Sequence, residues 1–279
     1  MARSLFAPRS LLFVPGSRPD MIAKLPRWPA DAAVIDLEDA VPAAGKDAAR
    51  QAGVAAAAGL DLPGTAVLVR VNPAGSPWFR DDLRTVSEAA AGGAVDGVVL
   101  PKCVSPAELA GVRTALPGGL IVAGLETAEG VAGCRGLLAR DVHAAYFGAE
   151  DYIADVGGRR TAAGLEVLHA RSEVMLACRL AGIGAIDQAV IAVGDDEQYL
   201  ADAEAGRAIG YTGKICVHPR QVELAHRVFT PSAAEVAHAR EVLAVAGAGV
   251  GTVDGQMVDD VHVRMARQVL DRARGEGGA

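Results

Sequence analysis

Eight short runs of aliphatic and β-branched residues recur along the chain, and most are followed by an alanine-rich segment with helical patterning. Runs of this length and composition are typical of buried β-strands, and their alternation with helices favours a parallel sheet. The predicted strands cover residues 10–14, 32–36, 66–71, 96–100, 120–124, 144–148, 185–190 and 213–217. The predicted helices between them cover residues 46–59, 80–91, 105–115, 127–139, 161–181 and 196–209.

Eight β/α units of this size fit a closed (β/α)8 TIM barrel, which we prefer to the alternative of a doubly wound open sheet. Residues 1–230 form the predicted barrel domain, although a helical pattern over 220–246 runs past its end. Residues 231–279 are the predicted C-terminal helical extension, a flap or lid within the same structural unit. The glycine-rich stretch 246–255 does not follow a strand inside a βαβ unit, so we interpret it as a hinge rather than a dinucleotide loop.

The charge and cysteine patterns exclude several classes of partner and cofactor. The 279 residues carry a net charge of −7 without a run of Lys or Arg, which argues against nucleic acid or an anionic membrane as partner. No apolar run reaches the roughly 18 residues that a membrane span needs. The four cysteines are far apart and form no CxxC pair, which is typical of reduced thiols in a cytoplasmic protein.

Ionisable or polar side chains lie at or just after the end of almost every predicted strand. In a barrel of this class the C-terminal strand ends meet at one mouth, where the chemistry takes place. A single such residue is readily explained as a helix cap or a solvated loop charge, and we favour that interpretation for Asp187 alone. Together they predict an acidic site, built from Arg18, Glu38, Asp39, Arg70, Asn72, Lys102, Glu126, Glu150, Asp151, Asp187 and His218.

Several carboxylates at one mouth require a cation, because their repulsion would otherwise force some of them to hold protons. The sequence has no cluster of His or Cys with transition-metal spacing, and oxygen ligands without imidazole favour Mg²⁺, with Mn²⁺ as a substitute. Glu126 and Asp151 follow adjacent strands and are the predicted metal ligands. Such a site suits chelation of a 2-keto or 2-hydroxy acid.

The segment "AVIDLEDAV" carries three acids within four positions, Asp36, Glu38 and Asp39. Arg70 lies within an apolar strand and must face an anion, because a buried unpaired guanidinium is very costly. That anion is a carboxylate of the site, the carboxylate of a substrate or an enolate formed in the reaction. We expect Glu38 and Asp39 to hold metal-bound waters and to orient Arg70, and Asp36 to be structural.

Positive charge after the first strand suggests a second function for the rim. Arg18 and Lys24, together with Arg9, are candidates for holding a phosphate-bearing part of a substrate. The alternative is that all three are ordinary surface bases.

The chain resembles the citrate lyase β-subunit-like (CitE-like) family of the HpcH/HpaI aldolase superfamily. Eight motifs carry the resemblance in order over essentially the whole chain: "RSLLFVPGSRPD", "VIDLEDAVPAAGKDAAR", "VRVN", "LPK", "LETAEG", "FGAEDY", "GKICVHPRQ" and "GQMVDD". Each motif is weak by itself, whereas eight in the right order are highly specific. The resemblance implies a homotrimer of (β/α)8 barrels and a Mg²⁺-dependent lyase that cleaves or forms a C–C bond in a citryl, malyl or citramalyl thioester of CoA or an acyl carrier.

The resemblance also implies roles for individual residues. Glu126 and Asp151 match the metal ligands of the family, and Arg70 matches the arginine that binds anionic substrate oxygens. Arg18 and Lys24 lie near positions that contact the CoA phosphates. Asp259, in "GQMVDD", matches a catalytic aspartate that a C-terminal flap delivers to the site of a neighbouring subunit, although from its sequence alone it reads as a helix cap.

Three alternatives to the lyase remain open at this point. The first is a thioester hydrolase acting on malyl-CoA-like substrates. The second is an aldolase acting on free 2-keto acids, against which Asp259 and the basic rim argue. The third is a carrier-dependent subunit of a citrate lyase complex that acts on a citryl-acyl carrier protein.

Overall fold

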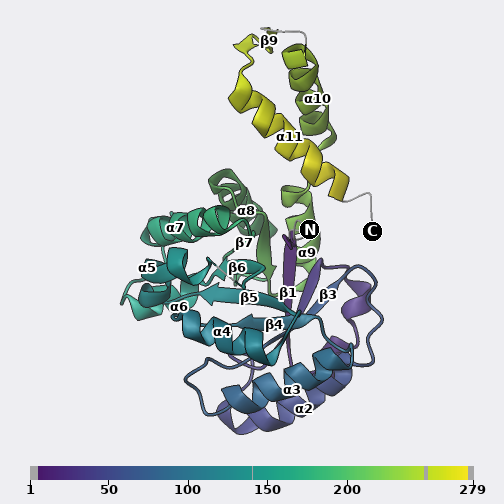
Figure 1. Ribbon diagram of the computed structural model, residues 1–279, viewed down its shortest axis with the longest axis vertical. Coiled ribbons are helices and arrows are strands. Elements are labelled where there is room, and N and C mark those ends of the chain that lie inside the picture. Colours follow the sequence, from purple (N-terminus) through teal and green to yellow (C-terminus); the bar gives the residue numbers. More distant parts are fainter. Residues whose placement is uncertain (1–5, 140, 248–250, 276–279) are drawn as a thin grey trace. The chain divides into compact units, whose positions relative to one another are not determined.

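Eight parallel strands close into a barrel in sequence order, and β8 pairs with β1 (Figure 1). The computed structural model describes residues 6–139, 141–247 and 251–275. The closed sheet confirms the predicted (β/α)8 architecture and excludes the open sheet. The strands are β1 Ser10–Pro15, β2 Ala32–Asp36, β3 Ala66–Arg70, β4 Gly97–Leu100, β5 Leu120–Leu125, β6 Ala144–Phe147, β7 Gly184–Asp187 and β8 Gly213–Cys216.

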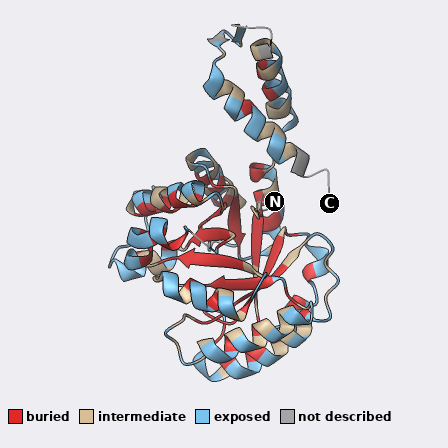
Figure 2. Ribbon diagram, in the orientation of Figure 1, coloured by how far each residue is buried: buried red, intermediate tan, exposed pale blue. Residues whose placement is uncertain are grey.

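Helices surround the barrel, and Figure 2 shows that the strands are almost entirely buried while the helices carry the exposed faces. This layering is expected when parallel strands are covered by amphipathic crossover helices. The helices are α1 Pro19–Ile22, α2 Lys46–Ala57, α3 Phe79–Ala91, α4 Pro106–Ala115, α5 Ala128–Leu137, α6 Ala149–Asp155, α7 Leu165–Ala181, α8 Asp196–Ile209 and α9 Pro219–Phe229.

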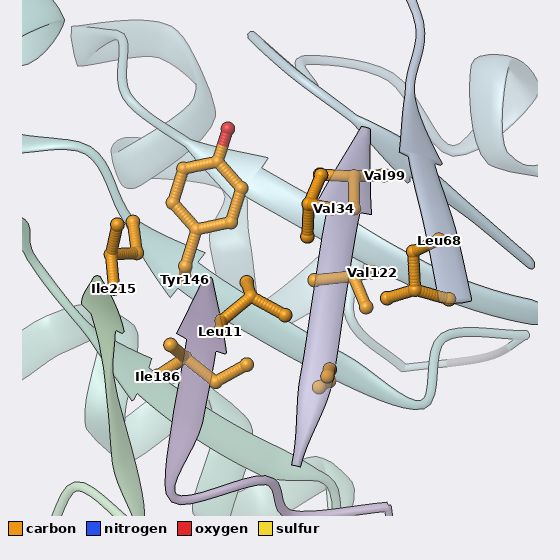
Figure 3. Close-up of a cluster of buried hydrophobic side chains, with 10 residues drawn as sticks. Leu11, Val34, Leu68, Val99, Val122, Tyr146, Ile186 and Ile215 are labelled. Atoms are coloured by element: carbon orange, nitrogen blue, oxygen red, sulfur yellow. The ribbon is translucent and has the colours of Figure 1, made fainter. Parts of the chain in front are cut away.

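The interior of the barrel is a packed aliphatic core and not a channel. Its buried members are Leu11, Ala32, Val34, Leu68, Val99, Val122, Ala144, Tyr146, Ile186 and Ile215 (Figure 3). Small and branched side chains from all the strands fill the narrow interior, as is usual for this fold. Tyr146 is the polar exception, and Figure 3 shows its hydroxyl directed away from the aliphatic cluster.

Two local predictions differ from the structure. The continuous helix expected over 220–246 is two helices, α9 and α10 Ala233–Gly247, because Pro231 lies between them and proline disrupts a helix interior. The short helix α6, directly after β6, was not predicted. It carries Glu150 and Asp151 in its first turn, so it bears directly on the site.

Asp187 does not lie at the barrel mouth but between the sheet and the helices. Its carboxylate accepts hydrogen bonds from Arg171 Nε on α7 at 2.8 Å and from Lys214 Nζ on β8 at 3.1 Å. Asp202 on α8 completes the network, at 2.5 Å from Lys214 Nζ. Asp187 and Lys214 are fully buried. These charges therefore compensate one another in the outer layer of the fold.

The C-terminal residues form a separate compact unit. The chain divides into Met1–His226 and Arg227–Ala279, inside α9 and close to the predicted boundary. In the second unit α10 packs against α11 Asp260–Gly275 around Ala239, Val242 and Ala266. A two-stranded antiparallel sheet, β9 Thr252–Val253 and β10 Gln256–Met257, lies between these helices in the sequence. The expected hinge at 246–255 falls partly outside the described residues.

All four cysteines are buried and free. Among the described residues, no helix combines the length and the apolar character that a membrane span requires.

We predict that Asp187→Ala lowers the free energy of unfolding by about 3–5 kcal/mol, because the buried Lys214 and Arg171 then share one carboxylate, that of Asp202, in place of two. Glu88→Ala is the matched control, since it removes one carboxylate from an exposed ion pair with Arg84 and is expected to cost about 1 kcal/mol or less. Urea unfolding of the three proteins measures both values. Equal effects of the two substitutions would show that the buried network is not needed for stability.

Candidate functional site

A cavity of about 430 Å³ opens at the C-terminal ends of the strands. One part of its wall is acidic and comes from the ends of β2, β5 and β6 and the start of α6. That part contains Asp36, Asp39, Glu126, Glu150 and Asp151, with Arg70 beside them. The cavity also has apolar lining residues, which include Phe13, Val14, Pro15, Ala189, Ile191, Ile215 and Val217.

Arg70 is held in this cavity by a bidentate ion pair across two neighbouring strands. Asp36 and Arg70 are register partners on β2 and β3. Arg70 Nε and Nη2 donate to the two carboxylate oxygens of Asp36, each at 2.7 Å. Although burial alone would raise the pKa of Asp36, the charge of Arg70 holds it below its usual range. Asp36 therefore has a structural role, because it fixes the position of the Arg70 guanidinium.

The third guanidinium nitrogen of Arg70 faces the next two acids along the chain. Arg70 Nη1 lies 2.9 Å from Glu38 Oε2 and 3.3 Å from Asp39 Oδ2. Glu38 is buried, whereas the side chain of Asp39 is half exposed. The Phe13 ring packs against the guanidinium, with its centroid 5.0 Å from Cζ. Glu38 and Asp39 are therefore the two carboxylates that lie beside the Arg70 nitrogen not used by Asp36.

Glu126 lies directly after β5 and is almost fully buried. Its carboxylate accepts hydrogen bonds from the backbone N–H of Lys102 at 2.7 Å and from the hydroxyl of Tyr146 at 3.2 Å. A Cβ atom at Gly148 would collide with this carboxylate, so glycine leaves the space that it occupies. Burial and the nearby Glu38 and Asp151 charges raise the pKa of Glu126 to about 7. Glu126 thus needs a cation to stay ionised at neutral pH.

Asp151 reaches the same site from the first turn of α6. Its Oδ1 lies 3.1 Å from Lys102 Nζ, and the same ammonium lies 2.6 Å from Glu38 Oε1. Because the Lys102 backbone also contacts Glu126, one residue connects the two predicted metal ligands. Lys102 has a φ of 48°, a left-handed conformation that residues other than glycine seldom adopt and that often occurs at functional sites.

The donor set fits a hard divalent cation. Among the described residues no group of three His, Cys, Asp or Glu is arranged to hold a metal, which disfavours a site closed by protein ligands alone. Mg²⁺ needs fewer, since it usually keeps waters and binds one or two carboxylates together with substrate oxygens. Glu126 and Asp151 supply such a pair. Glu38 Oε2, buried and without a hydrogen bond despite its ion pair with Arg70, adds negative charge nearby.

The predicted rim residues are exposed and paired with one carboxylate. Arg18 precedes α1 and donates to Asp20 at 2.8 Å through two nitrogens, while Lys24 Nζ lies 4.0 Å from the same carboxylate. Arg9 does not join them, because it precedes β1 at the opposite end of the barrel and pairs with Asp31 at 2.8 Å. The suggestion that Arg9 helps to hold a phosphate group is therefore wrong.

Two other residues expected near the mouth have different environments. Asn72 is buried and donates to Asp82 of α3 through its backbone N–H at 2.9 Å and its side-chain amide at 2.6 Å. His218 accepts a hydrogen bond from the backbone N–H of Arg220 at 3.2 Å, at the start of α9. Neither lines the cavity.

Asp259 belongs to the second compact unit, where it caps α11. Its Oδ1 accepts hydrogen bonds from the backbone N–H groups of Val261 at 2.8 Å and His262 at 3.1 Å. It also lies 2.7 Å from His262 Nδ1. The His262 backbone bond, followed by its side chain, lowers the pKa of Asp259. The side chain is half exposed and hence accessible to other groups.

Sequence reasoning missed Tyr146 and understated Lys102. Tyr146 is one of few aromatic residues in the chain and alternates into the barrel on β6, which was the available signal. A Cβ atom at Gly124 would collide with the Tyr146 hydroxyl, so glycine at this position leaves room for the phenol. Burial raises the pKa of Tyr146 well above its usual value, so it remains a hydrogen-bond donor.

Comparison with known proteins gives one consistent assignment. The HpcH/HpaI aldolase/citrate lyase family matches residues 9–219. A citrate lyase subunit beta-like protein of Deinococcus radiodurans is 48% identical over 277 residues, covering 94% of this chain and 96% of that protein. A (3S)-malyl-CoA thioesterase of Cereibacter sphaeroides is 33% identical, covering 98% of this chain and 97% of that protein.

A solved structure extends the similarity to three dimensions. CitE from Mycobacterium tuberculosis, in complex with magnesium, acetoacetate and coenzyme A, has a TM-score of 0.82 and 34% identity to this chain. The match covers 96% of this chain and 98% of that one. Sequence, fold and the order of the motifs agree, and the chain therefore belongs to the HpcH/HpaI aldolase/citrate lyase family.

Proposed function

We propose that this protein is a Mg²⁺-dependent carbon–carbon lyase that cleaves, or in reverse forms, a 3-hydroxyacyl thioester such as malyl-, citramalyl- or citryl-CoA. The products of cleavage are a 2-oxo acid and an acyl-CoA. The observation that carries the proposal is the acidic wall of the cavity, where Glu126 contacts the backbone N–H of Lys102 and Asp151 contacts the ammonium of the same residue, with Arg70 beside them. The magnesium and coenzyme A bound by the CitE relative support it.

Glu126 and Asp151 hold Mg²⁺ in this proposal, and Glu38 and Asp39 hold waters around it. When bound, the metal supplies Lewis acidity toward the hydroxyl and carboxylate oxygens of the acid half of the substrate. Tyr146 and the Lys102 backbone keep the Glu126 carboxylate in place by hydrogen bonding. The buried position of Glu126 excludes water from its far side, which strengthens its electrostatic interactions.

Arg70 stabilises the negative charge that develops on oxygen as the C–C bond breaks. Its guanidinium is already aligned by Asp36, so little reorganisation accompanies the reaction. A carboxylate of the acidic wall accepts the hydroxyl proton, and the bond between the hydroxyl-bearing carbon and the thioester α-carbon breaks. The hydroxyl-bearing carbon becomes the carbonyl of the 2-oxo acid, and the electron pair of the broken bond remains on the acyl thioester as its enolate. Asp259 donates the proton that this carbon needs, or removes it in the direction of synthesis.

The thioester handle and the assembly follow from the same proposal. Arg18 and Lys24 contact the phosphates of CoA, and the exposure of both side chains supports this role. The C-terminal extension acts as the lid, and in a homotrimer it carries Asp259 to the cavity of a neighbouring subunit. The free, buried cysteines support a reducing, cytoplasmic location.

The reaction type is tested by following two products at once. Purified protein is incubated with Mg²⁺ and malyl-, citramalyl- or citryl-CoA, or with a citryl-acyl carrier protein, and both free thiol and 2-oxo acid are measured. A lyase forms 2-oxo acid without free thiol. Free thiol without 2-oxo acid would instead identify a thioester hydrolase, the alternative favoured by the malyl-CoA thioesterase relative. Turnover only of a citryl-acyl carrier protein would identify a carrier-dependent subunit of a citrate lyase complex.

Removal of either predicted ligand is expected to weaken metal binding. We expect Glu126→Gln and Asp151→Asn each to raise the Kd for Mn²⁺ by at least about tenfold, because each loses an anionic oxygen ligand. Electron paramagnetic resonance of free Mn²⁺ measures this without turnover. Glu88→Gln is the control, since Glu88 is exposed, paired with Arg84 and outside the cavity lining, and a change of less than about threefold is expected. A metal Kd that both ligand variants leave unchanged would refute the assignment.

Asp259→Ala is expected to abolish lyase turnover while the Mn²⁺ Kd stays unchanged, because Asp259 moves a proton and binds no metal. The neighbouring-subunit role is tested by coexpressing Asp259→Ala with Glu126→Gln. Each variant is inactive alone, but random mixing in a trimer restores an intact site in about one quarter of cases. Absence of any activity in the mixed protein would rule out delivery of Asp259 between subunits.

A further inference from the structure

Lys102 uses two polar groups in two directions, and both reach the predicted metal site. The residue follows β4, where its left-handed backbone turns its N–H toward Glu126 Oε1 at 2.7 Å. The side chain contacts two other carboxylates: Nζ lies 2.6 Å from Glu38 Oε1 and 3.1 Å from Asp151 Oδ1. Asp39 Oδ1 is farther from it, at 3.7 Å.

The Lys102 ammonium balances negative charge at the site that Arg70 does not balance. Arg70 is aligned on Asp36 and has one remaining nitrogen for Glu38 and Asp39. Asp151 instead contacts Lys102.

We propose that Lys102 is a positioning residue whose ammonium is the resident counter-ion of Asp151 and is displaced when the divalent metal binds. This inference depends on the proposed metal site. The ammonium lies on Asp151 Oδ1, and a metal bound by the same carboxylate repels it, because both are cations. On metal binding the ammonium leaves Asp151 and keeps Glu38, its nearer partner.

The two groups of Lys102 have opposite effects on metal affinity. The backbone N–H favours binding, since it aligns the Glu126 carboxylate in the presence or absence of metal. The ammonium opposes binding, since the metal must replace it on Asp151. Lys102 thereby balances part of the charge of the metal-free site and lowers the affinity of the site for the metal. Displacement is a cation exchange in which no covalent bond changes.

The test is the Kd for Mn²⁺ in the absence of substrate, for wild type and three variants. Lys102→Met removes the ammonium and keeps a residue other than glycine at this left-handed position. Lys102→Gly also removes it but suits a φ of 48° and retains the N–H. We expect both to bind Mn²⁺ about tenfold more tightly than wild type, because a positive charge beside the site is lost. Lys102→Arg keeps the charge and is expected to remain within about threefold of wild type.

A second measurement separates displacement from a purely structural role. Without metal, Lys102→Met is expected to unfold at lower urea concentration than wild type, and saturating Mn²⁺ should remove the difference. Arg84→Met is the control for net charge, because it removes one positive charge from the exposed face of α3. It should change neither the Mn²⁺ Kd nor the effect of Mn²⁺ on unfolding.

The outcomes separate this inference from the proposed function. Unchanged or weaker Mn²⁺ binding by folded Lys102→Met and Lys102→Gly, with normal binding by wild type, would overturn the displacement alone. Circular dichroism shows whether the variants are folded. Failure of wild type to bind Mn²⁺ at all would overturn the metal site and this inference together.

Discussion

Repulsion among buried carboxylates is the constraint on which the barrel mouth depends. Glu38 and Glu126 are buried, Asp151 is near them, and burial together with the neighbouring charges raises the pKa of Glu126 to about 7. Two cationic side chains balance part of this negative charge. Arg70 is fixed by Asp36, and Lys102 contacts both Glu38 and Asp151. In the proposed function, a divalent cation held by Glu126 and Asp151 would balance the remaining charge and allow chelation of an oxygen-rich acid.

Most of the fold was predictable because strand and helix patterns have different periods. The eight aliphatic runs became the eight strands, and the closed sheet followed from their number and spacing. The short helix α6 was missed because seven residues show too little periodicity. The break at Pro231 was missed although proline was a visible signal.

The site was predictable at the level of which strand ends carry charge, and not at the level of contacts. Glu126, Asp151 and Arg70 reach one cavity because parallel strands bring their C-terminal ends together. Asp187 ends a strand too, but its side chain faces the helices, where Arg171 and Lys214 bind it. The direction of that side chain depends on strand register, and the left-handed turn at Lys102 depends on packing. Neither is encoded in residue type.

The most direct test of the account is crystallographic. Crystals grown with Mn²⁺ and a 2-oxo acid give anomalous scattering from the metal alone, which locates it without reference to activity. The account predicts a peak at coordination distance from the carboxylates of both Glu126 and Asp151, with Lys102 Nζ moved away from Asp151. A peak at any other position, or none at saturating Mn²⁺, would contradict it.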